Sequence, residues 1–390
     1  MALRTKHCFF LKDGRTLCNI TELIVALKEM SDKEFSRHGN KNDFAAWLGD
    51  VLAMKALAKK IQGKSREETI AILEKGFVYE TLIIGAGFSG ITVAIYASRK
   101  RMNYLVLSGD IGGQIAVSGE IGNYPGFAQT NYLEFQKNLN KQLAHNHVHI
   151  KQGTMVKSVT KKDNVFTIET DTGTYKSYTL IMAQGARART LNVPGEDEYA
   201  KRGVSYCAIC DGPLFTNKTV AVIGGGNSAL EAVDFMINIA DKTYMIVLGP
   251  ELKGHQALID NVKGQKKVEI IYNARTTEIF GDGKKVTGLK YDQKGKVHEL
   301  GLEGIFIEIG RIPNTEIVKS FVELDRDGHI VVNKHSETNV PGCYAAGDVS
   351  DVHEYQFIIA GGMGCMALLR AANYLAKLPV KLKAHATQAP

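Results

Sequence analysis

The chain has 390 residues, of which 44% are apolar and 23% are charged, and it contains 39 glycines against 8 prolines. This composition predicts a globular protein of two or three domains and excludes a proline-rich disordered chain. No apolar run approaches the roughly 18 residues that cross a membrane, and the start shows no leader pattern, so we expect a cytoplasmic protein without a membrane partner. The formal charge of +7 is spread out, without a basic cluster among aromatic residues, so we expect no nucleic-acid partner.

Residues 1–76 contain no glycine-rich turn and predict a small, mainly helical domain of three or four helices. Apolar residues recur at helical intervals between residues 43 and 61 and indicate one broad stripe that packs in a core. Phe9 and Phe10, just before a turn, predict a short strand. Two serine–glutamate pairs match the capping box that satisfies free N–H groups at a helix start. They are Ser31 with Glu34 and Ser65 with Glu68.

A first glycine-rich turn, Gly-x-Gly-x-x-Gly at residues 85–90, lies between an apolar run and an apolar helix, and a second apolar run follows at 104–107. Strand, glycine turn, helix and strand form the context that the dinucleotide-binding fingerprint requires. Gly85 allows a tight turn, Gly87 lets a pyrophosphate approach the backbone, and Gly90 lets the helix pack on the strand. The helix N-terminus then faces the phosphates.

The second half of the chain repeats this pattern. Residues 148–186 favour β-structure, and a Gly-x-Gly-x-x-Ala turn at 224–229 again follows an apolar strand and opens a helix. Residues 268–310 return to alternating strands. Residues 343–348 predict a strand end with an acid placed to meet a ligand, and 361–375 predict a helix.

Between the two glycine turns stands a Cys-x-x-Cys-Asp segment at 207–211. A thiolate is the nucleophile in disulfide exchange, and this spacing commonly lowers the pKa of one thiol. A zinc site would need a second Cys/His pair, and none has that spacing. An inert turn pair is the other alternative.

The other cysteines and the histidines carry no comparable pattern. Cys8 and Cys18 are interpreted as structural, and Cys343 and Cys365 as buried spectators, so we expect reduced thiols with one special pair. The eleven histidines form no ligand pattern and no metal site is expected. Alternating histidines, as on a solvated strand face, occur at His145, His147 and His149.

Taken together, the motifs resemble the low-molecular-weight thioredoxin reductase family of flavoproteins over roughly residues 77–380. The matching segments are 85–90, 112–114, 123–126, 207–212, 224–229, 310–315 and 345–348. The resemblance implies an α/β fold with two Rossmann-like three-layer (ββα) nucleotide-binding domains, the second inserted in the first, and a homodimer. The FAD domain would comprise 77–188 and 317–380, the NAD(P)H domain 189–316, and a short tail 381–390.

The resemblance also implies roles for single residues. FAD would be contacted by Gly85, Gly87, Ser89, Gly90, Gly113, Gln114, Asn123, Gly347, Asp348 and Gln356. The nicotinamide cofactor, NADH or NADPH, would meet Gly224, Gly226, Asn227, Ser228 and Ala229. Cys210 would lie nearer the flavin, Cys207 would attack the disulfide of a thioredoxin- or glutaredoxin-like partner, and Asp211 would donate or accept a proton.

The sequence departs from NADPH-using members of this family after the second strand of the nucleotide domain. Those members carry arginines that bind the extra 2′-phosphate, whereas residues 247–256 contain none. The segment looks more like the NADH-using flavoprotein component of alkyl hydroperoxide reductase, which has a Pro-Glu-x-Lys stretch there. Val247 stands where an acid would hold the ribose, and Ser108 stands at the matching place in the first half. We predict that NADH is preferred over NADPH and that neither binds tightly.

The N-terminal extension has no Cys-x-x-Cys of its own, unlike that hydroperoxide-reductase flavoprotein, and its role stays open between partner docking, dimer support and stability. The primary hypothesis is an NAD(P)H-dependent thioredoxin-disulfide reductase. One alternative keeps the fold but takes electrons from ferredoxin or another donor. The other is a flavin redox sensor that does not turn over.

Overall fold

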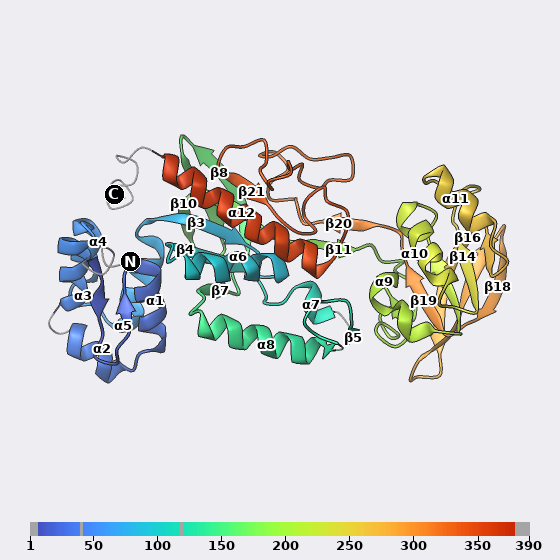
Figure 1. Ribbon diagram of the computed structural model, residues 1–390, viewed down its shortest axis with the longest axis horizontal. Helices are drawn as coiled ribbons and strands as arrows, with labels where there is room; N and C mark the ends of the chain where they lie inside the picture. The colour runs from blue at the N-terminus through green and yellow to red at the C-terminus, as the bar shows by residue number, and fades with distance from the viewer. Residues whose placement is uncertain (1–6, 40–41, 118–119, 129, 379–390) are drawn as a thin grey trace. The chain divides into compact units, whose positions relative to one another are not determined.

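The computed structural model describes residues 7–39, 42–117, 120–128 and 130–378, and its chain divides into two compact units (Figure 1). The first unit holds the described residues of Met1–Ala116, Phe135–Ala186 and Pro313–Pro390, and the second holds those of Val117–Glu134 and Arg187–Ile312. The first unit contains a mainly parallel sheet and the second a parallel sheet, both of the Rossmann type, which confirms the predicted α/β fold. The described residues between 117 and 134 cluster with the second unit, whereas the sequence analysis assigned them to the FAD domain. The predicted tail at 381–390 lies outside the described residues.

The N-terminal segment folds as a β-hairpin followed by short helices. Its elements are β1 (Phe9–Phe10), β2 (Thr16–Leu17), α1 (Ile20–Glu29), α2 (Asp32–Gly39), α3 (Asp43–Ala46), the π-helical turn Trp47–Val51, α4 (Lys55–Ile61) and α5 (Arg66–Lys75). Both predicted capping boxes form: Ser65 with Glu68, and Ser31 with Glu34. The apolar stripe between residues 43 and 61 is not one helix, because Ala53 adopts a left-handed backbone (φ 56°) that interrupts helical hydrogen bonding.

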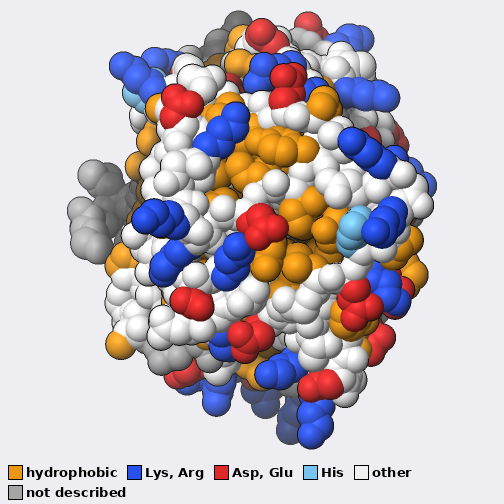
Figure 2. All heavy atoms as spheres, turned by 90° about the vertical axis from the view of Figure 1, so that its right-hand side faces the viewer, with side chains coloured by type: hydrophobic (Ala, Val, Ile, Leu, Met, Phe, Trp, Pro, Cys, Tyr) orange, Lys and Arg blue, Asp and Glu red, His pale blue; other side chains and the backbone are white. Residues whose placement is uncertain are grey.

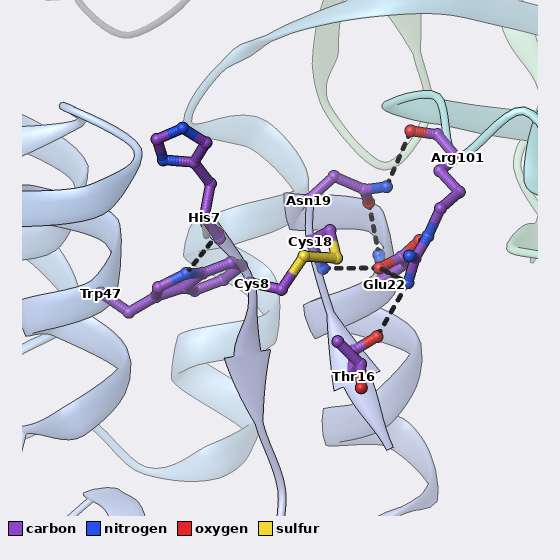
Figure 3. Close-up of a disulfide and its surroundings, with 8 residues drawn as sticks. All are labelled: His7, Cys8, Thr16, Cys18, Asn19, Glu22, Trp47 and Arg101. Carbon is purple, nitrogen blue, oxygen red and sulfur yellow. Dashed lines mark hydrogen bonds and ion pairs between the residues drawn. A yellow bond between two sulfur atoms is a disulfide. The ribbon is translucent and has the colours of Figure 1, made fainter. Parts of the chain in front are cut away.

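Cys8 and Cys18 form a disulfide that closes this hairpin (Figure 3). The antiparallel register pairs Phe9 with Leu17, so the positions just outside that pair face each other across the strands. The expectation of reduced thiols outside the Cys-x-x-Cys pair is therefore wrong for these two cysteines. Trp47 further fixes the hairpin by donating its indole N–H to the carbonyl oxygen of His7 at 3.1 Å.

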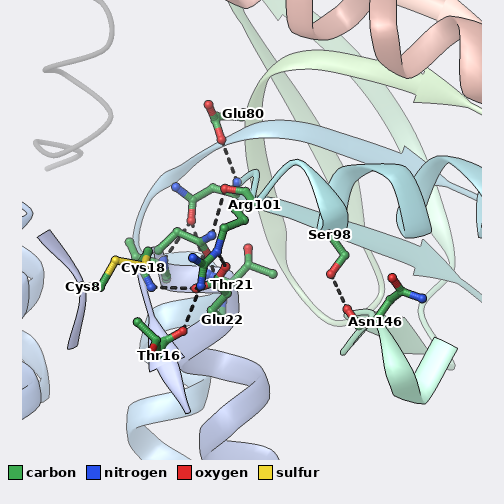
Figure 4. A network of polar contacts seen from close by, with 12 residues as sticks. Cys8, Thr16, Cys18, Thr21, Glu22, Glu80, Ser98, Arg101 and Asn146 are labelled. Carbon is green, nitrogen blue, oxygen red and sulfur yellow. Dashed lines mark hydrogen bonds and ion pairs between the residues drawn. A yellow bond between two sulfur atoms is a disulfide. The ribbon is translucent and has the colours of Figure 1, made fainter. Parts of the chain in front are cut away.

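A polar network attaches this segment to the first sheet (Figure 4). Arg101 donates to Glu22 at 2.7 Å, and the same carboxylate accepts the N–H of Cys18 at 2.6 Å. Thr21 donates its hydroxyl to the carbonyl oxygen of Tyr104 at 3.1 Å. The disulfide-closed hairpin and the sheet are thus joined within one unit.

The sheet of the first unit has the order β7-β4-β3-β10-β9-β8, with β21 also paired to β10. Strands β8 and β9 run antiparallel to their neighbours, and the others are parallel. The strands are β3 (Val78–Ile84), β4 (Tyr104–Ser108), β7 (Ile150–Gln152), β8 (Val156–Lys162), β9 (Val165–Thr170), β10 (Thr174–Met182) and β21 (Cys343–Ala345).

The central strands β3 and β4 and the second half of β10 are buried on both faces, which explains their continuous apolar sequences. Ile83 points into a core with α6 (Phe88–Arg99) and α12 (Phe357–Lys377), whereas Leu82 and Ile84 point into a core with the N-terminal helices and β9. Among the described residues, α12 is the one helix long and apolar enough to cross a membrane. Seven of its residues are buried, as in a core helix of a globular domain.

The second unit contains the parallel sheet β12-β19-β13-β14-β15 and the antiparallel sheet β16-β17-β18. Figure 2 shows one face of this unit, where apolar side chains gather among lysine, arginine and acidic side chains. The elements are β12 (Val204–Ser205), α9 (Ala208–Asp211), the 3-10 turn Gly212–Phe215, β13 (Thr219–Ile223), α10 (Asn227–Ile237), β14 (Lys242–Ile246), α11 (Gln256–Lys263), β15 (Val268–Ile271), β16 (Ala274–Gly281), β17 (Val286–Gln293), β18 (Lys296–Gly301) and β19 (Gly304–Ile307).

The remaining elements are short, apart from α8. They are α7 (Gln114–Val117), β5 (Glu120–Ile121), β6 (Thr130–Asn131), α8 (Tyr132–His145), β11 (Ala186–Ala188) and β20 (Arg311–Pro313). The three alternating histidines do not share a solvated strand face: His145 ends a helix, and His149 is buried. Burial, with a smaller contribution from Lys28, lowers the pKa of His149 to about 3, so its ring is neutral.

Candidate redox site and nucleotide-binding turns

The first glycine turn connects β3 to α6 and admits no side chain at two positions. A Cβ on Gly85 (φ 99°) would lie 2.4 Å from the carbonyl oxygen of Ala183, and one on Gly90 would lie 1.9 Å from that of Gly85. Gly87 differs, because a Cβ there would meet no atom within 4 Å. It caps α6 without a side-chain hydrogen bond, which leaves an open approach to the helix N-terminus.

The residues predicted to hold FAD fit a bound dinucleotide at this turn. The Ser89 hydroxyl is buried and has no hydrogen-bond partner among the described residues, as expected of a group that meets a ligand. A Cβ on Gly113 would lie 3.1 Å from Gly87, and one on Gly347 (φ 76°) would lie 3.2 Å from Ser89. Three loops distant in sequence therefore meet here, and Asp348 directly follows the third.

Three further site residues lie outside this close group. Gln114 donates its side-chain amide to the carbonyl oxygen of Ala186 at 3.2 Å, and Gln356 precedes the first turn of α12. Asn123 is exposed between β5 and β6, in the second unit. Ser108, at the place of the expected ribose acid, accepts the N–H of Ala86 at 3.1 Å and so supports the turn itself.

The second glycine turn connects β13 to α10 and is built alike. A Cβ on Gly224 (φ 143°) would lie 2.2 Å from the carbonyl oxygen of Glu308, and Ala229 is fully buried beside it. Gly226 caps α10 without a side-chain bond, and Ser228 is exposed in the first turn. This arrangement suits a second pyrophosphate.

The segment after β14 folds back onto this turn. Lys253 donates its N–H to the carbonyl oxygen of Gly225 at 2.7 Å, and Asn227 accepts the N–H of His255 at 2.8 Å. Val247 is buried and Leu248 is 65% exposed. The arginine-free segment 247–256 thus lies against the second glycine turn.

Cys207 and Cys210 form a disulfide across α9 in the second unit. The N–H of Cys210 donates to Sγ of Cys207 at 3.2 Å. Ser205 donates its hydroxyl to Asp211 at 2.6 Å and accepts the N–H of Cys207 at 3.1 Å. Both cysteines are half-buried, and Ile209 between them is 51% exposed. The pair is therefore a redox-capable disulfide with an ordered acid beside it.

Glu308 belongs to this site although the sequence reasoning missed it. Its carboxylate accepts the N–H of Ala208, the first residue of α9, at 3.2 Å, and its backbone lies against Gly224. Burial raises the pKa of Glu308 to about 7, against the opposing effects of the Ala208 N–H and Arg311. An acid directly after the buried strand β19 was the available signal. Glu308 connects the second glycine turn to the disulfide helix.

Comparison with known proteins agrees with this arrangement. Residues 79–372 match the family model described as pyridine nucleotide-disulphide oxidoreductase. The chain belongs to this family, whose members are FAD-dependent oxidoreductases that use a pyridine nucleotide and a redox-active disulfide. The region that matches the family model includes both glycine turns and the Cys207–Cys210 pair.

Its similar relatives fall into two groups. The chain is 38% identical over 330 residues to the F subunit of alkyl hydroperoxide reductase from Escherichia coli and 39% identical over 300 residues to that from Staphylococcus aureus, covering 83% and 76% of this chain. It spans only 63% and 59% of those relatives. Thioredoxin reductase from Streptococcus pyogenes superposes with a TM-score of 0.73 at 32% identity, over 77% of this chain and 99% of that one. Thioredoxin reductase from Giardia duodenalis gives the same values.

Proposed function

We propose that this chain transfers electrons from NADH, through FAD, to the Cys207–Cys210 disulfide and on to the disulfide of a thioredoxin- or glutaredoxin-like protein. The observation that carries the proposal is that disulfide, with its ordered acid, in one chain with two glycine turns open to phosphate. When bound, FAD accepts a hydride from the nicotinamide and supplies two electrons to the disulfide.

The cysteine pair would act as a two-step exchanger. Two electrons and one proton open its disulfide to a thiolate and a thiol. The Cys207 thiolate attacks the partner disulfide and displaces one partner thiolate, which leaves a mixed disulfide. Cys210 then attacks Cys207, releases the second partner thiol and restores the internal disulfide. The N–H of Cys210 donates to Sγ of Cys207 in the disulfide and would stabilise the Cys207 thiolate once the pair is reduced.

Asp211 and Glu308 would manage protons and geometry. Asp211, held by Ser205, exchanges the proton of the cysteine pair. Glu308 positions α9 through the N–H of Ala208, and its raised pKa makes this contact sensitive to pH near neutrality. Asp211 is close in sequence to Ser205 and the cysteines, whereas Glu308 is 100 residues away from Ala208.

The cofactor residues follow from the same proposal. We assign the FAD domain to 77–188 and 317–380 and the nucleotide domain to 189–316. The turn at Gly85 together with Ser89, Gly113 and Gly347 would hold FAD, and the turn at Gly224 would hold the nicotinamide cofactor. We further propose that the protein is cytoplasmic and forms a homodimer, and sedimentation of the flavin-loaded protein tests the homodimer.

NADH is the proposed donor because residues 247–256 offer no arginine for a 2′-phosphate. Turnover with the two nucleotides at equal, subsaturating concentration should favour NADH by about tenfold or more, since a charge-assisted phosphate contact contributes on the order of 1.5–3 kcal/mol. Leu248→Arg with Gly249→Arg should raise kcat/KM for NADPH, and Leu248→Gln with Gly249→Gln is the uncharged control. A clear NADPH preference of the unmodified chain contradicts the assignment.

A second candidate acceptor follows from the 38% sequence identity to the F subunit of alkyl hydroperoxide reductase. In that case the reduced pair delivers electrons to the disulfide of a peroxide-reducing protein. Parallel assays with a thioredoxin and with a peroxidase disulfide, under NADH, separate the two acceptors. Failure with both, despite flavin reduction, contradicts both.

A further inference from the structure

A second cluster of reactive side chains lies in the first unit, where the turn between residues 325 and 329 meets the segment before α12. Asp325, His329 and His353 each direct one ligand atom toward the others, and all three atoms lie within 4.8 Å of one another. The histidines show no ligand pattern in the sequence because the fold, not their spacing, brings them together.

The buried histidine of this cluster has an unused ring nitrogen. The His329 side chain is 3% exposed, and its Nδ1 has no hydrogen-bond partner among the described residues. Oδ2 of Asp325 lies 3.7 Å away, which is too long for a hydrogen bond. A buried polar atom without a partner is costly, so this nitrogen indicates a missing ligand.

The surrounding groups orient the cluster as they would around a metal ion. Tyr355 places its hydroxyl 3.0 Å from Nε2 of His329 and 3.4 Å from Nδ1 of His353, so the opposite nitrogen of each ring is left toward Asp325. Oδ1 of Asp325 accepts the backbone N–H groups of Asp327 and His329 at 2.9 and 2.8 Å, which leaves Oδ2 for the centre. Such outer partners fix the tautomer and direction of metal ligands.

The spacing fits a small, tetrahedrally coordinated cation. Ligands about 2.0–2.1 Å from a zinc ion stand about 3.3 Å apart. Oδ2 of Asp325 lies 3.4 Å from Nε2 of His353 and 3.7 Å from Nδ1 of His329. The His353 side chain is 51% exposed, so solvent leaves room for this ring to move closer to His329 when an ion binds. Two imidazoles and one carboxylate suit Zn²⁺ and disfavour Mg²⁺ or Ca²⁺.

We propose that Asp325, His329 and His353 form a zinc site with a fourth position open to water, and that Tyr355 is its positioning residue. The ion would tie the 325–329 turn to the segment that leads into α12. The site lies outside the cysteine pair and does not depend on the proposed electron transfer.

Calorimetric titration of Zn²⁺ into the chelator-treated, oxidised, flavin-loaded protein tests this proposal, because both disulfides are closed and only Cys343 and Cys365 are free thiols among the described residues. We expect one ion per chain and a rise in Tm, since only the folded state offers the site. His353→Ala should weaken binding at least tenfold, and Tyr355→Phe about tenfold. His335→Ala, in the same unit but outside the cluster, should bind as the unmodified chain does.

His353 is the primary target because its exposure makes a folding defect avoidable, and the metal-free Tm of each variant verifies this. Co²⁺ offers a second readout: d–d absorption without a thiolate-to-metal band supports the site. Binding that His353→Ala does not weaken, absence of stoichiometric binding, or a thiolate band overturns it.

Discussion

The two glycine turns share one local design but differ in what lies beside them. At both, a left-handed glycine lies against a carbonyl group and a second glycine caps a helix. Beside the first turn lies the Ser89 hydroxyl, which has no hydrogen-bond partner in the described part of the chain. The second turn is covered by the arginine-free segment that bonds to Gly225 and Asn227. If both turns hold a pyrophosphate as proposed, their neighbouring loops, and not the turns themselves, would select the nucleotide.

Removing either redox cysteine should abolish reduction of the partner disulfide while flavin reduction by NADH continues. We expect this change to cause the greatest loss of activity. Cys207→Ser or Cys210→Ser should lower NADH-driven disulfide reduction by roughly 10³-fold or more, because the two thiols act as one unit. Flavin reduction by NADH should persist in both variants. Cys365→Ser, at a half-buried cysteine on α12, is the control and should retain turnover. Substantial activity of either serine variant contradicts the exchange scheme.

Two substitutions in the first turn test its steric and ligand-facing positions separately. Gly90→Ala places a Cβ 1.9 Å from a backbone oxygen, so the free energy of unfolding should fall by about 3 kcal/mol and flavin should be lost. Gly87→Ala meets no atom within 4 Å, so that variant should fold normally and bind FAD more weakly. Denaturation and flavin content measure both. Equal stability of the two variants contradicts the steric account.

The raised pKa of Glu308, in the second unit, predicts that the free energy of unfolding depends on pH. Its pKa in the folded state is raised from 4.5 to about 7, so the folded protein binds the proton more tightly than the unfolded chain. Ionisation of the Glu308 carboxyl therefore destabilises the folded protein. This effect is absent below pH 4.5, grows as the pH rises toward 7, and is complete above pH 7. Glu308→Gln should therefore stabilise the protein by up to about 3 kcal/mol above pH 7 and by little below pH 4.5. An unchanged pH profile of denaturation would falsify the raised pKa.

A more modest change is expected at the hairpin attached to the first unit. Cys8→Ser with Cys18→Ser removes a cross-link over ten residues, which should lower the free energy of unfolding of that segment by ~2–3 kcal/mol. Turnover should change little, since these cysteines lie far in sequence from the redox pair. Trp47 fluorescence during denaturation follows the segment directly, because its indole bonds to His7. Loss of turnover with an intact segment would instead assign this disulfide a redox role.

Local motifs account for what could be predicted from the sequence. The glycine turns and both capping boxes follow from short-range backbone needs, so residues 85–90, 224–229 and Ser65 could be placed without tertiary information. Contacts set by register or packing could not. The disulfide of Cys8 with Cys18 depends on hairpin register, and the burial of His149 depends on elements far away in the chain.

Two features of the candidate sites could not be predicted from the sequence either. Glu308 reaches α9 only because β19 lies in the same sheet as β12, and the cluster of Asp325, His329 and His353 depends on two loops meeting. A charged residue at the end of a buried strand was the only sequence signal for the first. Nothing in the spacing indicated the second.

The proposed electron path can be followed in one anaerobic titration with NADH that records flavin absorbance and the number of titratable thiols together. We predict prompt bleaching, the appearance of two thiols per chain at Cys207 and Cys210, and recovery of the flavin when a disulfide protein is added. A flavin that NADH does not bleach would contradict the proposed donor. Bleaching without new thiols, or without recovery by any disulfide protein, would contradict the electron path.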